Sequence, residues 1–159
     1  MNVTIEMLGI DQADTALEWV GKLLDELGAE GQELGALDRD RILDAWKMNA
    51  DRVHIFAARS ESNGIVGVLT LSENFAIYTN GHYGLINELL VSPDHRSSGI
   101  GARLIEAVKE MGRSRGWTRI EVGTPEEERW LRTRQFYRRQ GFVFAGPKLK
   151  FRLEPEALR

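Results

Sequence analysis

Arg96-Ser97-Ser98-Gly99-Ile100-Gly101 joins an apolar segment that ends in Leu89-Leu90-Val91 to a long segment with helical apolar spacing. This order predicts a strand, a glycine-containing turn and the first turn of a helix. That first turn leaves backbone N–H groups without intrahelical partners, and the aligned peptide dipoles place partial positive charge there. A phosphate group can therefore dock at this turn, because Gly99 and Gly101 carry no Cβ that would hold it away from the main chain.

Apolar periodicity elsewhere predicts one α/β domain over residues 1–159, with hairpins in its middle and a strand-helix-strand unit after them. We expect strands at 3–8, 53–58, 65–71, 82–91, 118–122, 142–145 and 148–153. Helices are expected at 13–27, from Asp38, from Ile100 to about 112–116, and from Thr124 to Gly141. Asn80-Gly81 predicts a hairpin turn, and Thr124 with Glu127 predicts a capping box. Three glycines weaken helix in the connection 28–37, which is either a plain loop or a lid over a second substrate.

Composition excludes several classes of protein. The 159 residues contain no cysteine, so disulfides, cysteine-bound metals and a cysteine nucleophile are all excluded. The three histidines have no close ligand spacing, and no metal site is expected. The first residues lack a basic start followed by a long apolar run, and no stretch approaches the roughly 20 apolar residues of a membrane helix. We therefore expect a soluble cytoplasmic protein with no membrane partner.

Charge is unevenly distributed along the chain. Residues 1–94 carry 6 Lys/Arg and 16 Asp/Glu, a net −10, whereas residues 95–159 carry 15 and 8, a net +7. A basic C-terminal part suits a polyanionic ligand such as a nucleotide cofactor, and an acidic N-terminal part attracts a cationic second ligand. The alternative is that these charges lie on solvated helix faces. Nucleic-acid binding is not expected, because the remainder is acidic and no binding motif is present.

Arg96, Gly99 and Gly101 match the acyl-CoA binding motif of the GNAT acyltransferase superfamily, which is Gln or Arg, two variable residues, Gly, one variable residue, then Gly or Ala. The succession of predicted elements is similar to the GNAT fold over nearly the whole chain, most specifically over residues 82–144. This resemblance implies a mixed, mostly antiparallel central sheet flanked by helices. It also implies an N-acetyltransferase that uses acetyl-CoA as cosubstrate.

The resemblance implies how CoA is bound. The strand ending at Val91 would splay from its neighbour at a β-bulge, so that its backbone groups pair with the pantetheine amides as an added strand would. The residues expected to bind the cofactor are Leu89, Leu90, Val91, Arg96, Ser97, Ser98, Gly99, Ile100, Gly101 and Ala102.

Glu88 is the candidate general base. An amine acceptor is protonated near neutral pH, since a lysine-like amine has a pKa of about 10.4, and it must lose a proton before it attacks a thioester. A carboxylate among Ile86, Leu89 and Leu90 is partly desolvated, which raises its pKa and makes it a better base. Many GNAT enzymes carry a glutamate at this position, acting directly or through water. The alternative is a carboxylate paired with an arginine or exposed at the strand end.

Tyr137 resembles the tyrosine that GNAT enzymes place near the thioester sulfur as general acid for the leaving thiolate. A phenol can donate a hydrogen bond or its proton without carrying charge at neutral pH. Helical spacing puts Trp130, Thr133 and Tyr137 on one face, so the alternative is a core residue. Trp130 also departs from the family, many members of which have an asparagine there that contacts CoA.

The sequence thus predicts transfer of an acetyl group from acetyl-CoA to a primary amine of a small molecule or peptide, directly in a ternary complex. Glu88 would deprotonate the amine, backbone N–H groups near Leu90 or Val91 would polarise the thioester carbonyl, and Tyr137 would protonate the thiolate. Two alternatives are a non-catalytic acyl-CoA sensor and a nucleic-acid-associated adaptor. A homodimer is compatible with this type of fold.

Overall fold

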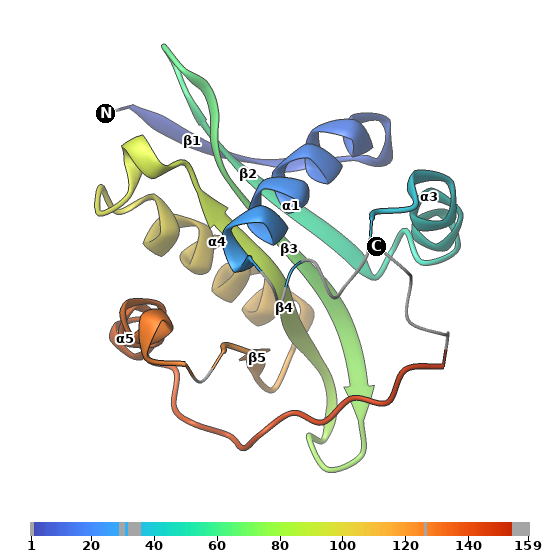
Figure 1. The fold of residues 1–159 in the computed structure, drawn as a ribbon. Helices are drawn as coiled ribbons and strands as arrows, with labels where there is room; N and C mark the ends of the chain where they lie inside the picture. The colour runs from blue at the N-terminus through green and yellow to red at the C-terminus, as the bar shows by residue number, and fades with distance from the viewer. Residues whose placement is uncertain (1, 29–30, 32–35, 126, 154–159) are drawn as a thin grey trace.

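The computed structural model describes residues 2–28, 31, 36–125 and 127–153. A five-stranded sheet with the strand order β1-β2-β3-β4-β5 forms its centre (Figure 1). The strands are β1 (Val3–Leu8), β2 (Val53–Ser60), β3 (Gly64–Ala76), β4 (Gly81–Val91) and β5 (Ile120–Val122). The helices are α1 (Ala13–Leu27), α3 (Arg39–Met48), α4 (Ile100–Arg115) and α5 (Leu131–Arg139). Short 3₁₀ helices lie at Ile10–Gln12, Pro93–His95 and Glu128–Trp130.

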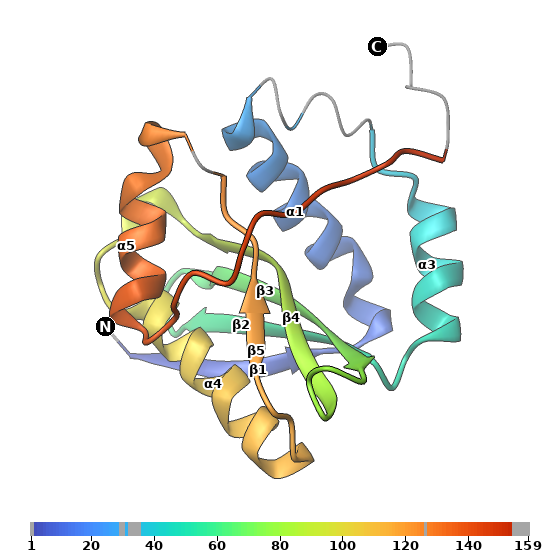
Figure 2. The same cartoon turned by 90° about the horizontal axis from the view of Figure 1, so that it is seen from below.

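Helices cover both faces of the sheet. The first four strands pair antiparallel and β5 pairs parallel with β4, so the predicted mixed, mostly antiparallel sheet is confirmed. One face packs on α4 and α5, and the other on α1 and α3 (Figure 2). Each helix turns an apolar stripe toward the strands, and two hydrophobic clusters result. The α4/α5 cluster contains Leu69, Leu71, Ile86, Leu104, Ile105 and Tyr137. The α1/α3 cluster contains Trp19, Trp46, Ile55, Val68 and Leu90.

A β-bulge in β4 decides which side chains face which cluster. Thr70 of β3 lies opposite Glu88, but the next residue, Leu71, lies opposite Ile86, so Asn87 is an extra residue in β4. An extra residue reverses the alternation of side chains beyond it. Glu88 and Leu90 therefore lie on the α1/α3 face, whereas in an unbroken strand both would lie on the α4/α5 face with Ile86.

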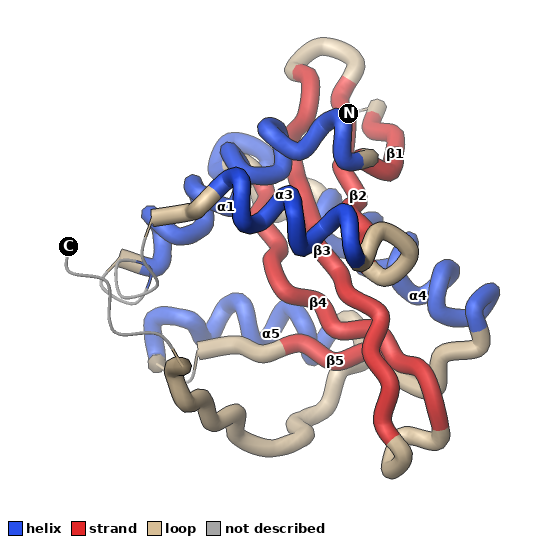
Figure 3. The backbone as a smooth tube through the Cα atoms, turned by 90° about the vertical axis from the view of Figure 1, so that its right-hand side faces the viewer, coloured by secondary structure: helices blue, strands red, loops and turns tan. Residues whose placement is uncertain are grey.

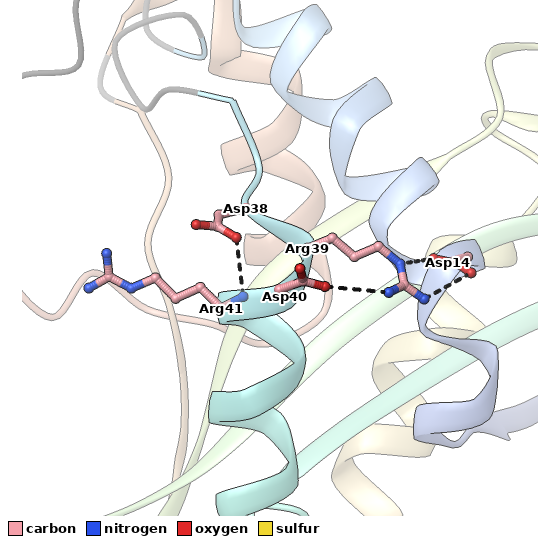
Figure 4. A network of polar contacts seen from close by, with 5 residues as sticks. All are labelled: Asp14, Asp38, Arg39, Asp40 and Arg41. Atoms are coloured by element: carbon pink, nitrogen blue, oxygen red, sulfur yellow. Dashed lines mark hydrogen bonds and ion pairs between the residues drawn. The ribbon is translucent and has the colours of Figure 1, made fainter.

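Several local signals act as predicted. Asn80 and Gly81 adopt positive φ, at 61° and 133°, in the hairpin between β3 and β4. Asp38 caps α3, where its carboxylate accepts a hydrogen bond from the Arg41 N–H at 3.2 Å. The Arg39 guanidinium binds the Asp14 carboxylate of α1 at 2.6 Å, which ties these two helices together (Figure 4). That hydrogen bond holds the pKa of Asp14 below its usual range.

The C-terminal part differs from the prediction. The strands expected at 142–145 and 148–153 are wrong, because residues 142–153 follow an extended path without strand pairing (Figure 3). Alternating side chains favour an extended conformation, but a strand also needs a partner edge, and this segment lies along none. Of the connection 28–37, residues 29, 30 and 32–35 lie outside the described residues.

The predicted capping box at Thr124 and Glu127 is also wrong. The helical path begins with the 3₁₀ helix Glu128–Trp130, and α5 follows from Leu131. The guanidinium of Arg134 donates to the carbonyl oxygens of Pro125 and Glu127, each at 2.9 Å. A side chain from within α5 therefore binds the carbonyl oxygens of the loop before the helix, and Thr124 and Glu127 do not form the predicted cap.

Two glycines test the packing of the fold. A Cβ added at Gly84 in β4 would lie 2.4 Å from the Trp117 ring, whereas one added at Gly21 in α1 would meet nothing within 4 Å. Gly84→Ala should lower stability by about 1–3 kcal/mol through overpacking, and Gly21→Ala should raise it by about 0.5–1 kcal/mol through helix propensity. Thermal unfolding of both variants checks this, and a Gly84→Ala protein at least as stable as the wild type would contradict the packing described.

Candidate active site

The free edge of β4 forms the centre of the candidate site. β5 pairs with β4 only from Gly84 to Ile86, while β4 continues to Val91, so beyond Ile86 this edge of β4 has no strand neighbour among the described residues. The Ser92 N–H donates to the Val66 carbonyl on the β3 side at 2.8 Å. Backbone direction alternates along an antiparallel ladder, so Leu90 directs its backbone groups toward β3, and Leu89 and Val91 direct theirs to the open side.

The loop after β4 leads from this edge to the start of α4. Ser97 and Gly99 have positive φ, at 64° and 85°, and Gly99 is the N-cap of α4. Residues with positive φ thus alternate with residues of ordinary φ at the N-terminus of a helix. This backbone conformation turns successive N–H groups toward one concave surface, which suits an anion. The loop is exposed from Arg96 to Gly99, so this surface is open to a ligand.

The two glycines of the loop serve different purposes. At Gly99 nothing lies within 4 Å of an added Cβ, so glycine is required by its positive φ. An added Cβ at Gly101 would lie 3.0 Å from the Phe136 ring of α5. The expectation that both glycines make room for a phosphate is therefore revised, because Gly101 allows α4 to approach α5. Ile100 has its side chain in the α4/α5 cluster, and Ala102 lines a hollow beside β1, so only their backbone groups face the loop.

Arg96 is held in place by two contacts. Its Nε donates to the Val91 carbonyl at 3.0 Å, and its Nη2 binds the carboxylate of Glu26 in the last turn of α1. Glu26 did not emerge from the sequence, because its partner is 70 residues away and no local pattern marks it. A phosphate that uses the Arg96 guanidinium has to compete with this carboxylate.

A second arginine also reaches the end of α1. The Arg129 guanidinium donates to the Leu27 carbonyl at 3.1 Å and lies 5.2 Å from the Trp130 ring centre. The last turn of α1 is thus tied to the loop before α4 through Arg96 and to the start of α5 through Arg129. The Trp130 Nε1 atom is buried with no hydrogen-bond partner in the described structure.

Glu88 lies in a desolvated position beside Thr70. The Thr70 hydroxyl donates to the Glu88 carboxylate, and the Glu88 N–H donates to the same hydroxyl oxygen at 3.1 Å. Burial raises the pKa of Glu88 above its ordinary value, and the hydrogen bond from Thr70 opposes this with a smaller effect. Among the described residues Glu88 has no ion pair with an arginine, and its side chain is partly buried. It is therefore neither an arginine-paired carboxylate nor a fully exposed one at the strand end.

Tyr137 is buried in the α4/α5 cluster, with 7% of its surface exposed. Its ring makes edge-to-face contacts with Phe136 and Phe142, at 5.2 and 5.5 Å between centroids. Burial raises the pKa of the phenol, which therefore stays protonated and can act as a donor. Leu89 and Val91 pack against the same cluster, so their side chains lie on the same face of the sheet as the Tyr137 ring.

Glu88 and Tyr137 belong to opposite faces of the sheet. Glu88 lies on the α1/α3 face because of the bulge, and Tyr137 on the α4/α5 face. No contact joins them directly. A ligand that touches both has to pass the edge of β4 where β5 no longer covers it.

A sequence profile of the Acetyltransferase (GNAT) family matches residues 21–142. The chain belongs to this family. An IAA acetyltransferase from Azospirillum brasilense is 29% identical over 130 residues, which cover 80% of this chain and 79% of that protein. No helix in the described ranges is long and apolar enough to cross a membrane, and no group of metal-ligating side chains was found in the same ranges.

Solved structures of GNAT enzymes share the fold of this family member. An aminoglycoside acetyltransferase from an uncultured soil metagenomic sample aligns with a TM-score of 0.79 at 21% identity, covering 97% of this chain and all of that one. A ribosomal-protein-alanine N-acetyltransferase from Brucella melitensis aligns with a TM-score of 0.70 at 18% identity, covering 96% and 100%. At these identities the similarity concerns the fold.

The raised pKa of Glu88 predicts a pH-dependent effect on stability. Because the pKa is higher in the folded than in the unfolded chain, the contribution of Glu88 is full below the unfolded value of about 4.5 and is lost as pH rises through the folded value. The stability of Glu88→Gln relative to the wild type should therefore increase as the pH is raised from 4 to 8. Thermal unfolding across this range measures the gain, with Glu61→Gln at an exposed turn as the control. A difference independent of pH would show that Glu88 is not desolvated.

Proposed function

We propose that this GNAT protein transfers an acetyl group from acetyl-CoA to a primary amine of a small molecule or peptide, directly within a ternary complex. The observation that carries the proposal is the open edge of β4, which runs into the positive-φ loop at the start of α4. An extended amide chain fits the first feature and a diphosphate fits the second. Both fit one ligand class, a thioester of CoA.

The main chain is proposed to bind most of the cofactor. The outward groups of Leu89 and the outward N–H of Val91 would pair with the pantetheine amides, since the Val91 carbonyl already accepts from Arg96 and the groups of Leu90 face β3. Arg96, Ser97, Ser98, Gly99 and the first N–H groups of α4 would receive the diphosphate. The Ser98 hydroxyl donates to the His95 carbonyl, so Ser98 would act through its backbone. Bound acetyl-CoA supplies the acetyl group as an activated thioester.

Glu88 is proposed as the base that removes the proton from the amine. Its raised pKa makes it a stronger base than an exposed glutamate, and the Thr70 hydroxyl orients the carboxylate. An acceptor would approach from the α1/α3 face, where Glu88 lies. The net −10 of residues 1–94 favours a cationic amine there.

Tyr137 is proposed to donate from the opposite face. Its phenol would hydrogen-bond to the sulfur as negative charge develops there and would transfer the proton to the thiolate. Burial raises the pKa of Tyr137, so the phenol favours hydrogen bonding to the sulfur over full transfer. A proton that it does give to the thiolate is replaced by the second proton that leaves the acylated nitrogen. The outward N–H groups of β4 would polarise the thioester carbonyl between these two side chains.

The names of similar proteins suggest the acceptor class. Solved structures with this fold include enzymes whose names specify an aminoglycoside or the alanine of a ribosomal protein. Both descriptions refer to amines, one in a small molecule and one in a polypeptide. The acceptor of this protein is proposed within that range.

Thiol release from acetyl-CoA over a panel of amines tests the reaction. Glu88→Gln should lower kcat/KM by about 10²- to 10⁴-fold near pH 7, and the loss should shrink at high pH, where the amine is already deprotonated. Tyr137→Phe should lower kcat while CoA binding is retained, and Glu61→Gln serves as the control. Full activity of both Glu88→Gln and Tyr137→Phe would refute the assigned roles. Tight CoA binding without turnover would indicate a sensor instead.

Glu26 should compete with the cofactor for Arg96. Removing its charge in Glu26→Gln should lower the Kd for CoA by about two- to fivefold, the range expected for an exposed ion pair, and Arg96→Gln should raise it. Glu18→Gln is a matched control, because Glu18 lies on the same helix and pairs with Lys22. Calorimetry with CoA measures all four proteins. Weaker or unchanged binding by Glu26→Gln would exclude this competition.

A further inference from the structure

A strip of polar side chains runs along the α1/α3 face of the sheet, from Glu88 toward the β3–β4 hairpin. Thr70, the partner of Glu88, lies on this face because it pairs on its other side with Ile55 of the α1/α3 cluster. Side chains two residues apart on a strand share a face, and so do the side chains of paired residues. The next polar residues on this face, called the polar strip below, are Ser72 and Asn74 of β3 and Tyr83 and Asn87 of β4.

Asn87 belongs to the polar strip although it is the extra residue of the bulge. Its side-chain amide donates to the Ser72 hydroxyl at 3.1 Å, which places it on the same face as Glu88. The distance along β3 from Thr70 to Asn74 is about 14 Å at 3.4 Å per residue. The polar strip therefore continues the proposed acceptor position well beyond the carboxylate of Glu88.

Neither α1 nor α3 covers the polar strip. The nearest members of the α1/α3 cluster on these strands are Val68 of β3 and Leu90 of β4, which lie beyond Glu88 on the side away from the strip. Residues 142–153 pass along the α1/α3 side of the sheet (Figure 2), but the large apolar side chains of residues 143–153 are 82–94% exposed. Side chains so exposed do not pack on the strip, so among the described residues it is open to a ligand.

The polar strip has hydrogen-bonding capacity that the protein does not use. Among the described residues, the Asn74 side chain and the Tyr83 hydroxyl have no hydrogen-bond partner, and the Asn87 side chain donates once. The strip itself carries no charge. Glu121 of β5 shares its face and is bound by Arg119 at 3.4 Å, so the charge of this carboxylate is balanced within the protein.

Uncharged polar side chains distinguish between classes of acceptor. Amides and hydroxyls complement the hydroxyl groups of a ligand, which both donate and accept hydrogen bonds. An apolar body would desolvate the strip without giving it partners, and a second charged group would find no free opposite charge in it. Leu85 lies between these side chains on the same face and suits the carbon skeleton of a ligand. The strip therefore fits a neutral, hydroxyl-bearing body attached to the amine at Glu88.

We propose that the acceptor is a polyhydroxylated amine, such as an amino sugar or an amino alcohol, and that the polar strip selects it. This inference rests on the proposed acetyl transfer and specifies its acceptor. The amine lies at Glu88, which removes its proton, and the hydroxyl-bearing carbons extend along the strip toward the hairpin. The four side chains of the strip contact the acceptor away from the reacting atoms, so they determine specificity.

Two primary amines of equal chain length test the proposal. Glucamine (1-amino-1-deoxyglucitol) has a hydroxyl on every carbon except the one that bears the amine, and 1-aminohexane has none. Thiol release from acetyl-CoA measures kcat/KM for each. The wild type should prefer glucamine by about tenfold or more. Tyr83→Phe and Asn74→Leu should each lower kcat/KM for glucamine by about two- to tenfold, the effect of one neutral hydrogen bond, and leave the value for 1-aminohexane unchanged.

The matched control is Ser62→Ala, which removes a hydroxyl in the exposed turn at the other end of β3 and should change neither value. Equal or better use of 1-aminohexane or of a lysine peptide by the wild type would overturn the proposal and leave acetyl transfer intact. An equal loss for both amines in the two variants would do the same. No turnover of any amine by protein that binds CoA would instead overturn the proposed function.

Side-chain amide signals measure the contact without chemistry. In isotopically labelled protein saturated with CoA, glucamine should shift the side-chain amides of Asn74 and Asn87, whereas 1-aminohexane should not. The side-chain amide of Asn63, in the turn before β3, is the control and should not move with either amine. Unchanged signals of Asn74 and Asn87 at glucamine concentrations that saturate turnover would show that the acceptor lies elsewhere.

Discussion

β4 extends beyond its parallel neighbour, and the candidate site depends on this difference in length. β5 covers β4 only up to Ile86, and the bulge at Asn87 follows at once. The outward groups of Leu89 and the outward N–H of Val91 are thereby left without a strand partner, while the Val91 carbonyl accepts from Arg96, on a strand otherwise packed on both faces. Unpaired backbone groups are costly to bury without a partner, so a ligand with its own amides is a suitable occupant. The same bulge turns Glu88 to the α1/α3 face and leaves Tyr137 on the other.

The last turn of α1 connects the parts that surround this edge. Its carboxylate at Glu26 binds Arg96 of the loop before α4, and its carbonyl at Leu27 binds Arg129 before α5. Both contacts use arginines from the basic C-terminal part of the chain and oxygens from the acidic N-terminal part. The acidic N-terminal part and the basic C-terminal part of the chain thus meet in the ion pair between Glu26 and Arg96, which holds the site together. A polyanionic ligand would enter the electrostatic field of the same basic part.

Sequence reasoning reached the elements whose signals are local. Helical spacing identified α1, α3 and α4, and the Asn80-Gly81 turn and the cap at Asp38 were read from single residue types. It missed features that depend on residues far apart in the chain. Thr70 and Glu26 are marked by no motif, Gly101 is explained by Phe136, and the loop at Thr124 is held by Arg134 from inside α5 in place of a helix cap. Residues 148–153 have a strand pattern, but pairing requires a second edge that a pattern cannot specify.

The central claim is that the main chain of β4 and of the following loop binds the acyl carrier. Amide chemical shifts of isotopically labelled protein, titrated with CoA at moderate salt, test it residue by residue. The account predicts that the amides of Leu89, Val91 and Ser97 to Gly101 shift together and saturate at one concentration of CoA, whereas those of β1 do not move. Shifts confined to other parts of the molecule, or none at all, would contradict it.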